Sequence, residues 1–202
     1  MNITLLAKFA ATALVTSIFS GCATADTMTL SPNRQGEYLN TEIPVGWQQV
    51  LSSTNTNLSI AEYLPADASE EWVQKLSVEA MSGEQLPDPL EFVDGWAHDQ
   101  SSLCDEFRDH AIFSGFENGY PSVVRMLVCG KNKRTGKPLV TMIKVIRGNQ
   151  SLYTITRIWR LETLPLARTE VASWSNALRK TIACNPQLPA HPCPNPSSSD
   201  DT

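Results

Sequence analysis

The chain has 202 residues, of which 42% are hydrophobic and 18% are charged, and this size and composition suit a single domain with a hydrophobic core. Its 21 acidic residues outnumber its 16 basic ones, so the net charge is −5. Nucleic acid requires a basic binding face, and the acidic composition therefore excludes it as the expected partner.

The N-terminal segment, residues 1–21, is typical of a signal peptide. Lys8 precedes an apolar run, Phe9–Phe19, that is shorter than the ~20 residues needed to span a bilayer. Residues 23–25 (Ala-Thr-Ala) form a small-x-small site, at which ordinary signal peptidase would release a soluble periplasmic or secreted protein.

A second cleavage site competes with this one. The four residues Phe19-Ser20-Gly21-Cys22 resemble the lipobox of bacterial lipoproteins, in which the cysteine is lipidated and becomes the first residue of the mature chain, although leucine is usual where Phe19 stands. Because Ala23 and not aspartate follows the cysteine, the resemblance implies sorting to the outer membrane. We expect Cys22 to anchor the protein there, facing the periplasm, since two or three acyl chains suffice for stable anchoring.

The cysteine count supports export. If Cys22 is lipidated, the four cysteines that remain can form two disulfides, as in proteins of an oxidising compartment. Three pairings are possible, and the sequence alone does not choose between them. We favour Cys104–Cys129 and Cys184–Cys193, because the second pair encloses a Pro-rich loop that closes easily.

Alternating apolar residues predict a strand-rich domain. The expected strands are residues 38–43, 47–53, 58–64, 72–80, 106–116, 122–129, 139–147 and 152–159. Asp88 as N-cap and Pro89 as first helical residue begin a helix that ends near Leu103, and a second helix is expected over residues 164–183. These elements predict an α+β fold with an antiparallel sheet of about six to seven strands, packed by two main helices.

Composition sets the expected domain boundaries. Residues 22–36 are polar and small and read as a flexible tether, and residues 185–202 form a tail rich in Pro and Ser. The single folded domain is therefore expected over residues 37–184.

Short motifs within this order of elements resemble the PsbP/Mog1/DcrB-like group of small proteins. The motifs are Pro44-Val45-Gly46-Trp47 after the first strand and Gly148, Leu152 and Tyr153 at the end of the strand meander, with one helix in mid-chain and one closing helix. The resemblance implies an α/β/α sandwich. Members of the group include small envelope lipoproteins and non-enzymatic assembly or accessory factors, and the cysteines are not part of its general pattern.

The three histidines do not form a recognisable catalytic or metal-binding set. His98 lies among acidic residues on the first helix, which fits a solvated helix face, and His110 lies in a strand, where neighbouring side chains alternate between faces. His191 lies in the Pro-rich tail and is too loosely held for catalysis. Cys104 is close in sequence to two of the histidines, and in an oxidising compartment we expect a disulfide there instead of a nucleophile. We therefore expect no enzymatic activity, no metal and no cofactor.

The segment between Gly130 and Lys137 is rich in basic residues. It does not match a phosphate-binding loop, because five residues separate its glycines and Pro138 stands where serine or threonine is required. The ordinary interpretation of this segment is a charged hairpin tip. For Trp47, which follows the first turn, the ordinary interpretation is packing in the core. The alternative is a partner surface, in which Lys131, Lys133, Arg134 and Lys137 would face an acidic partner or anionic headgroups and a partly exposed Trp47 would anchor a partner.

Together with export, these features predict a non-enzymatic envelope lipoprotein. We expect it to act as a binding, accessory or assembly factor at the membrane surface, with another envelope protein as its partner. One alternative is a small-ligand carrier, periplasmic or secreted, that binds an apolar or anionic ligand between sheet and helix. The last alternative is an enzyme of unrecognised type.

Overall fold

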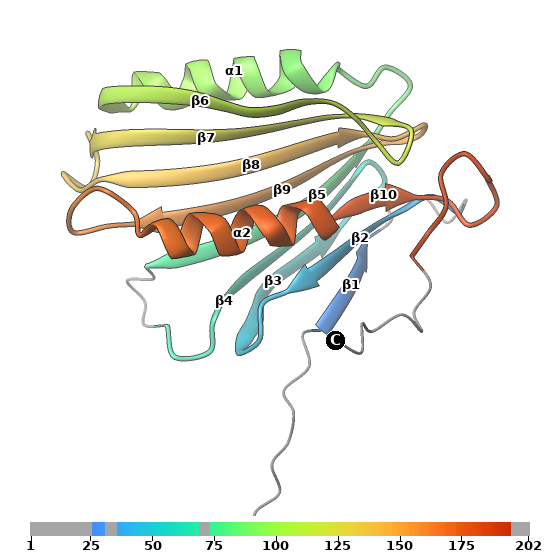
Figure 1. Ribbon diagram of the computed structural model, residues 1–202, viewed down its shortest axis with the longest axis horizontal. Helices are drawn as coiled ribbons and strands as arrows, with labels where there is room; N and C mark the ends of the chain where they lie inside the picture. The colour runs from blue at the N-terminus through green and yellow to red at the C-terminus, as the bar shows by residue number, and fades with distance from the viewer. Residues whose placement is uncertain (1–25, 31–35, 69–72, 195–202) are drawn as a thin grey trace, which may run out of the picture.

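The computed structural model describes residues 26–30, 36–68 and 73–194, and within them the chain forms ten strands and two helices (Figure 1). The strands are β1 (Asp26–Leu30), β2 (Tyr38–Ile43), β3 (Trp47–Thr54), β4 (Leu58–Pro65), β5 (Gln74–Ser82), β6 (Cys104–Glu117), β7 (Tyr120–Asn132), β8 (Leu139–Arg147), β9 (Ser151–Arg160) and β10 (Ile182–Cys184). The helices are α1 (Pro89–Ser102) and α2 (Arg168–Lys180). The expected signal peptide, Cys22 and Trp72 lie outside the described residues.

Seven of these strands form one sheet, in the order β3-β4-β5-β9-β8-β7-β6. Every pair of neighbours in it is antiparallel. This sheet and the two helices packed against it confirm the predicted α+β class.

The middle of the large sheet is covered on both faces, and the central strands β8 and β9 are therefore buried along nearly their whole length, whereas the edge strands β3 and β6 are mostly exposed. On one face, α1 places Val93 against Ile143 and Leu152. On the other face, α2 places Trp174 and Leu178 in the larger hydrophobic cluster of the protein. Burial of these apolar side chains is the main stabilising term for the layers.

A small sheet, in the order β1-β2-β10, lies beside α2 on the second face (Figure 1). Leu39 of β2 and Ala183 of β10 are fully buried in the same cluster as α2. The outer layers are thus α1 on one face, and α2 with the small sheet on the other. The arrangement is a sandwich of the predicted type, with a small sheet added to one of its helical layers.

The first helix begins as expected. The Asp88 side chain accepts a hydrogen bond from the Leu90 N–H at 2.8 Å, and Pro89 occupies the first turn. The second helix is shorter than the expected 164–183, because Ile182–Cys184 pair with β2 as strand β10 and the helix ends before them.

Two boundaries of the folded part also differ from those expected. Residues 26–30 lie in the expected tether, yet they form β1 and pair with β2. The open edge of a strand offers unpaired N–H and C=O groups, so it can order a segment that has little apolar character of its own. In the expected tail, Asn185 donates its N–H to the His191 carbonyl at 2.8 Å, and the His191 ring stacks on Tyr120 with centroids 3.9 Å apart.

The four cysteines of the described region form two disulfides. Cys104–Cys129 and Cys184–Cys193 have Cα–Cα distances of 5.5 and 5.0 Å, and these are the pairs favoured from the sequence. Two disulfides indicate an oxidising, extracytoplasmic compartment. Of the helices in the described residues, neither is long and apolar enough to cross a membrane.

Candidate functional site

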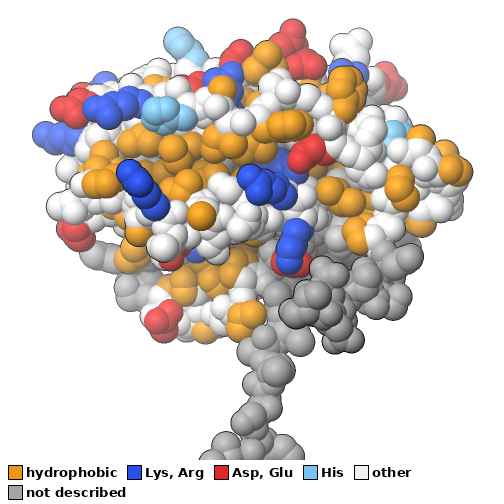
Figure 2. Space-filling view, viewed as in Figure 1, with side chains coloured by type: hydrophobic (Ala, Val, Ile, Leu, Met, Phe, Trp, Pro, Cys, Tyr) orange, Lys and Arg blue, Asp and Glu red, His pale blue; other side chains and the backbone are white. Residues whose placement is uncertain are grey.

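An open groove runs between helix α2 and the edge strand β6, on the face of the sheet that α2 covers. Its floor is formed by β7 and β8, and we call it the α2 groove. Figure 2 shows it as a band of hydrophobic side chains above α2, bordered by Lys, Arg and His side chains. It contains two hollows, of about 400 Å³ towards the start of α2 and about 210 Å³ towards its end.

The larger hollow is mainly apolar. Met126 and Val128 of β7 form its floor, and Leu164 and Val171 form its wall on the α2 side. In the smaller hollow, the apolar part of the lining comes from Ile112, Phe113, Val124 and Leu178. Concave apolar surfaces of this size are typical of ligand-binding sites.

The strand register explains why these side chains share one face. In the β6–β7 pair, Arg108 lies opposite Val128 and His110 lies opposite Met126, so all four point to the α2 side. The register shifts between Ala111 and Phe113, where β6 carries one extra residue. Helix α2 crosses the sheet nearer its middle, and it leaves β6 and part of β7 uncovered.

The groove has a positively charged border, although the chain is acidic overall. Arg108 and His110 line the larger hollow, and Arg179 lines the smaller one. Arg179 has one long hydrogen bond, of 3.4 Å to the Asn176 side chain, and Arg108 has no ion pair or side-chain hydrogen bond with any described residue. These guanidinium groups are therefore open to an anionic ligand.

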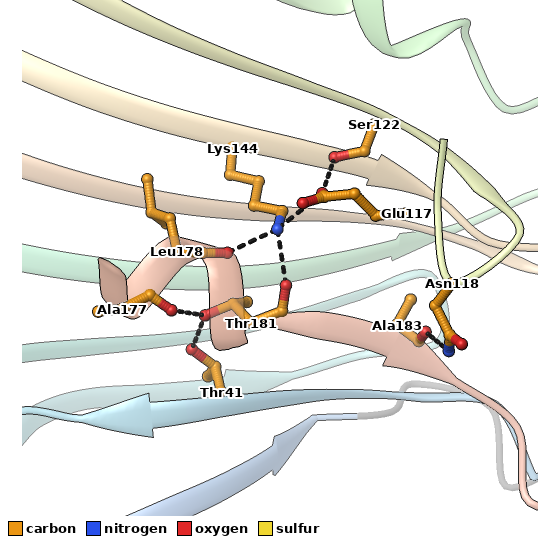
Figure 3. A network of polar contacts seen from close by, with 9 residues as sticks. All are labelled: Thr41, Glu117, Asn118, Ser122, Lys144, Ala177, Leu178, Thr181 and Ala183. Carbon is orange, nitrogen blue, oxygen red and sulfur yellow. Dashed lines mark hydrogen bonds and ion pairs between the residues drawn. The ribbon is translucent and has the colours of Figure 1, made fainter. Parts of the chain in front are cut away.

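A buried lysine fixes the C-terminal end of α2 beside the smaller hollow (Figure 3). The fully buried Lys144 Nζ lies 2.8 Å from Glu117 Oε2 and donates to the Leu178 and Thr181 carbonyls at 2.6 and 2.7 Å. All three N–H groups of the ammonium thus have an acceptor. Glu117 also accepts a hydrogen bond of 2.7 Å from Ser122 Oγ.

This arrangement fixes the geometry of the groove at that end. Burial lowers the pKa of Lys144, while the hydrogen bond and the negative charge of Glu117 act in the opposite direction. A cation near the last carbonyls of a helix also interacts favourably with the helix dipole. Lys144 belongs to β8, Glu117 to β6 and the two carbonyls to the end of α2. The floor of the smaller hollow and its two walls are therefore joined at one point (Figure 3).

A second buried cation lies under α2 on the side away from the groove. The Arg157 guanidinium carbon lies 5.0, 4.9 and 5.2 Å from the ring centroids of Trp47, Trp159 and Trp174. Its Nη2 also lies 3.5 Å from the Glu170 carboxylate of α2. These cation–π contacts and the ion pair hold α2 against β9. With Lys144, they make the groove a preformed feature of the fold.

Comparison with known proteins places the arrangement among solved structures. No family model matches the chain, and neither does any curated protein sequence. Similar structures include a Pseudomonas aeruginosa protein of unknown function, at 17% identity and a TM-score of 0.42, with 84% of this chain and 99% of that one covered. The Saccharomyces cerevisiae Ran-binding protein Mog1 matches at 13% identity and a TM-score of 0.42, with 76% of this chain and 85% of that one covered.

A third similar structure is LpqN of Mycobacterium tuberculosis, a protein involved in cell envelope biogenesis. It matches at 10% identity and a TM-score of 0.49, with 78% of this chain and 90% of that one covered. Mog1 belongs to the group that the sequence resembles. The three TM-scores lie below 0.5, and no role, ligand or partner is carried over from these structures.

The residues named for a partner surface lie in two separate places in the structure. Trp47 lies on the edge strand β3, whereas the basic segment joins β7 to β8, and β4, β5 and β9 separate β3 from β8. Trp47 is half-buried against Arg157. In the basic segment, Lys133 donates to the Ser102 carbonyl at the end of α1, at 2.8 Å, and Lys137 lies 2.6 Å from Glu162. Lys131 and Arg134 are exposed at the hairpin, and their role in partner binding stays a prediction.

The histidines occupy three separate places. His98 is exposed on α1, His110 lines the α2 groove and His191 packs on Tyr120. Within the described residues, no group of three or more His, Cys, Asp or Glu side chains could hold a metal ion. A site between sheet and helix was one of the alternatives drawn from the sequence, but Arg108 and Arg179 were not among the expected site residues. The available signal was the pair Arg108 and His110, which alternation places on the same face of an edge strand.

Proposed function

We propose that this protein is a non-enzymatic binding protein of the bacterial envelope and that the α2 groove is its binding surface. The observation that carries the proposal is the groove itself: it is open and apolar, and it is bordered by Arg179 and by Arg108, which has no ion pair with any described residue. Burial of apolar surface in such a groove supplies affinity, and a guanidinium group orients a polar part of the ligand.

The N-terminal sequence and the disulfides support the place of action in this proposal. A lipid on Cys22 holds the domain at the periplasmic face of the outer membrane, and the two disulfides suit that compartment. In this arrangement the anchor supplies location and the groove supplies recognition. The protein then acts as an accessory or assembly factor that holds another envelope component.

A second candidate function is that of a free small-ligand carrier. The position of Met126 between sheet and helix favours it, since a flexible thioether side chain suits an adaptable apolar site. The carrier would use the same groove and would differ in its N-terminus, which cleavage after residue 25 would leave without lipid. The intact mass of the mature protein, measured after thiol alkylation, separates the two: acyl chains on Cys22 support the anchored factor, and an unlipidated N-terminus supports the carrier.

Site-specific photo-crosslinking in growing bacteria tests the binding surface. A photoreactive phenylalanine derivative is placed at Leu164 in the groove, which is 38% exposed, or at Leu51 on the opposite edge strand, which is 42% exposed. We expect a cross-linked product, seen as a mass increase, from position 164 and none from position 51. A third variant carries the probe at Arg134, on the basic hairpin. Products from position 134 with none from position 164 would assign binding to that hairpin and refute the groove.

A further inference from the structure

We infer that the ligand of the α2 groove is an anionic amphiphile: an acyl chain that lies along β7 and a carboxylate or phosphate that contacts Arg108. The inference rests on the proposed function and names the class of ligand for the same site. It follows from the shape of the groove, the distribution of charge along it and the chemistry of its walls.

The shape suits a chain. The two hollows follow one another along the same face of the β6–β7 pair, from Arg108 and Val128 in the first to Phe113 and Val124 in the second. Because β6 carries its extra residue in this stretch, the span from Arg108 to Phe113 matches the four strand steps from Val128 to Val124 of β7, about 14 Å. The groove is thus longer than a compact metabolite requires. An extended apolar chain would cover Met126 and Val128 and would remove the exposed surface of Phe113 from water.

The charges place the anionic end. The lining of the larger hollow includes Arg108 and His110 and no acidic side chain, whereas the smaller hollow sets the Glu117 carboxylate against Arg179. Glu117 is held by the buried Lys144, so that lysine is already neutralised and is not available to a ligand. Arg108 is exposed and has no ion pair with a described residue, so it can form charge-assisted hydrogen bonds with an incoming anion. The headgroup therefore lies at the Arg108 end, and the chain runs towards the smaller hollow.

The walls favour an acyl chain over a peptide. A peptide that binds in extended form needs backbone donors and acceptors from its site. In the groove, the backbone of β7 is paired on both sides, with β6 and with β8, so the floor offers side chains only. Those side chains are mostly aliphatic, and an aliphatic chain leaves no polar group unsatisfied against them.

Equilibrium binding of three probes tests the inference. The full chain is exported with Cys22→Ser, so that it stays in solution, and is titrated with palmitate, with lysophosphatidylglycerol and with palmityl alcohol. We expect at least one of the two anionic probes to bind about tenfold or more tightly than the alcohol, because only they can contact Arg108 as anions. Palmitate as the tighter ligand identifies a free fatty acid as the source, and lysophosphatidylglycerol identifies an acyl lipid. Equal binding of all three probes, or no binding, overturns the inference.

Paired variants locate the binding. Leu164→Glu and Arg108→Glu should each lower the affinity for the anionic probe by about tenfold or more, since each adds negative charge to the larger hollow. The matched variants Leu51→Glu and Arg134→Glu make the same changes outside the groove and should leave binding unchanged. If none of the four substitutions changes the affinity, the ligand binds elsewhere and the inference is overturned. If cross-linking from position 164 captures a protein segment while no amphiphile binds, the ligand class fails and the groove remains the binding surface.

Discussion

Replacing Lys144 with methionine is expected to lower the free energy of unfolding by about 3 to 5 kcal/mol. Methionine keeps much of the volume of the side chain and removes its charge. The substitution leaves the Glu117 carboxylate without its buried cation, and it leaves the Leu178 and Thr181 carbonyls without a donor. Losing Lys144 costs more than the ion pair itself contributes, because two helix-end carbonyls lose their donor and the Glu117 carboxylate, 23% exposed, stays only partly solvated.

Chemical denaturation of matched variants measures this loss. Lys137→Met removes the exposed ion pair with Glu162 and should change the stability by no more than about 0.5 kcal/mol. The double variant Lys144→Met with Glu117→Gln should lose less than the sum of its single variants, because the two sites are coupled. A Lys144→Met protein as stable as the Lys137→Met protein would show that Lys144 does not hold α2 in place.

The Cys104→Ala, Cys129→Ala double variant is expected to lose about 3.5 kcal/mol of stability. This disulfide joins residues 25 apart in sequence, and it ties the start of the edge strand β6 to β7. Without the bridge, the unfolded chain gains conformational freedom, and an edge strand paired on one side only loses its fixed end. Because Arg108 lies four residues after Cys104, the groove wall should also become less ordered.

The second disulfide provides the control. Cys184–Cys193 joins residues only 9 apart, and its removal is expected to cost about 2.5 kcal/mol in the same loop-entropy model. Denaturant unfolding gives both values, and hydrogen exchange at β6 reports the local effect. A larger loss from the Cys184–Cys193 pair, together with unchanged exchange in β6, would contradict this account of the edge strand.

The strands could be predicted from sequence because their apolar residues alternate, and alternation is a local signal. The end of α2 could not be predicted in this way. Residues 182–184 continue the apolar stripe of the helix, and they become a strand only because they pair with β2. The same holds for β1, whose polar sequence has a partner distant in the chain. In both cases pairing with a strand distant in sequence determines the structure: residues 182–184 form a strand instead of helix, and residues 26–30 form a strand instead of a tether.

A ligand site between sheet and helix was one alternative from the sequence, but the position and the lining of the groove could not be predicted. Its existence depends on where α2 crosses the sheet, and that position is fixed by buried cations whose residue type predicts exposure. Lys144 lies in an apolar strand and would be expected to point to solvent, yet it is fully buried under the end of α2. Arg157 is likewise buried, and two of the tryptophans around it, Trp47 and Trp174, are distant in sequence. The burial of charged residues that hold two layers together depends on the tertiary structure, and the periodicity of the sequence does not predict it.

Methyl NMR at Met126 is the most direct test of the claim that the α2 groove is the binding surface. Met126 lines the groove, and Met81, which packs at the cluster under α1 on the other face of the sheet, serves as an internal control. The exported protein with labelled methionine methyl groups is mixed with the protein and lipid fractions of bacterial envelopes. We predict that at least one fraction shifts or broadens the Met126 signal and leaves the Met81 signal unchanged. An unchanged Met126 signal with every fraction, or equal changes at both methionines, would contradict the claim.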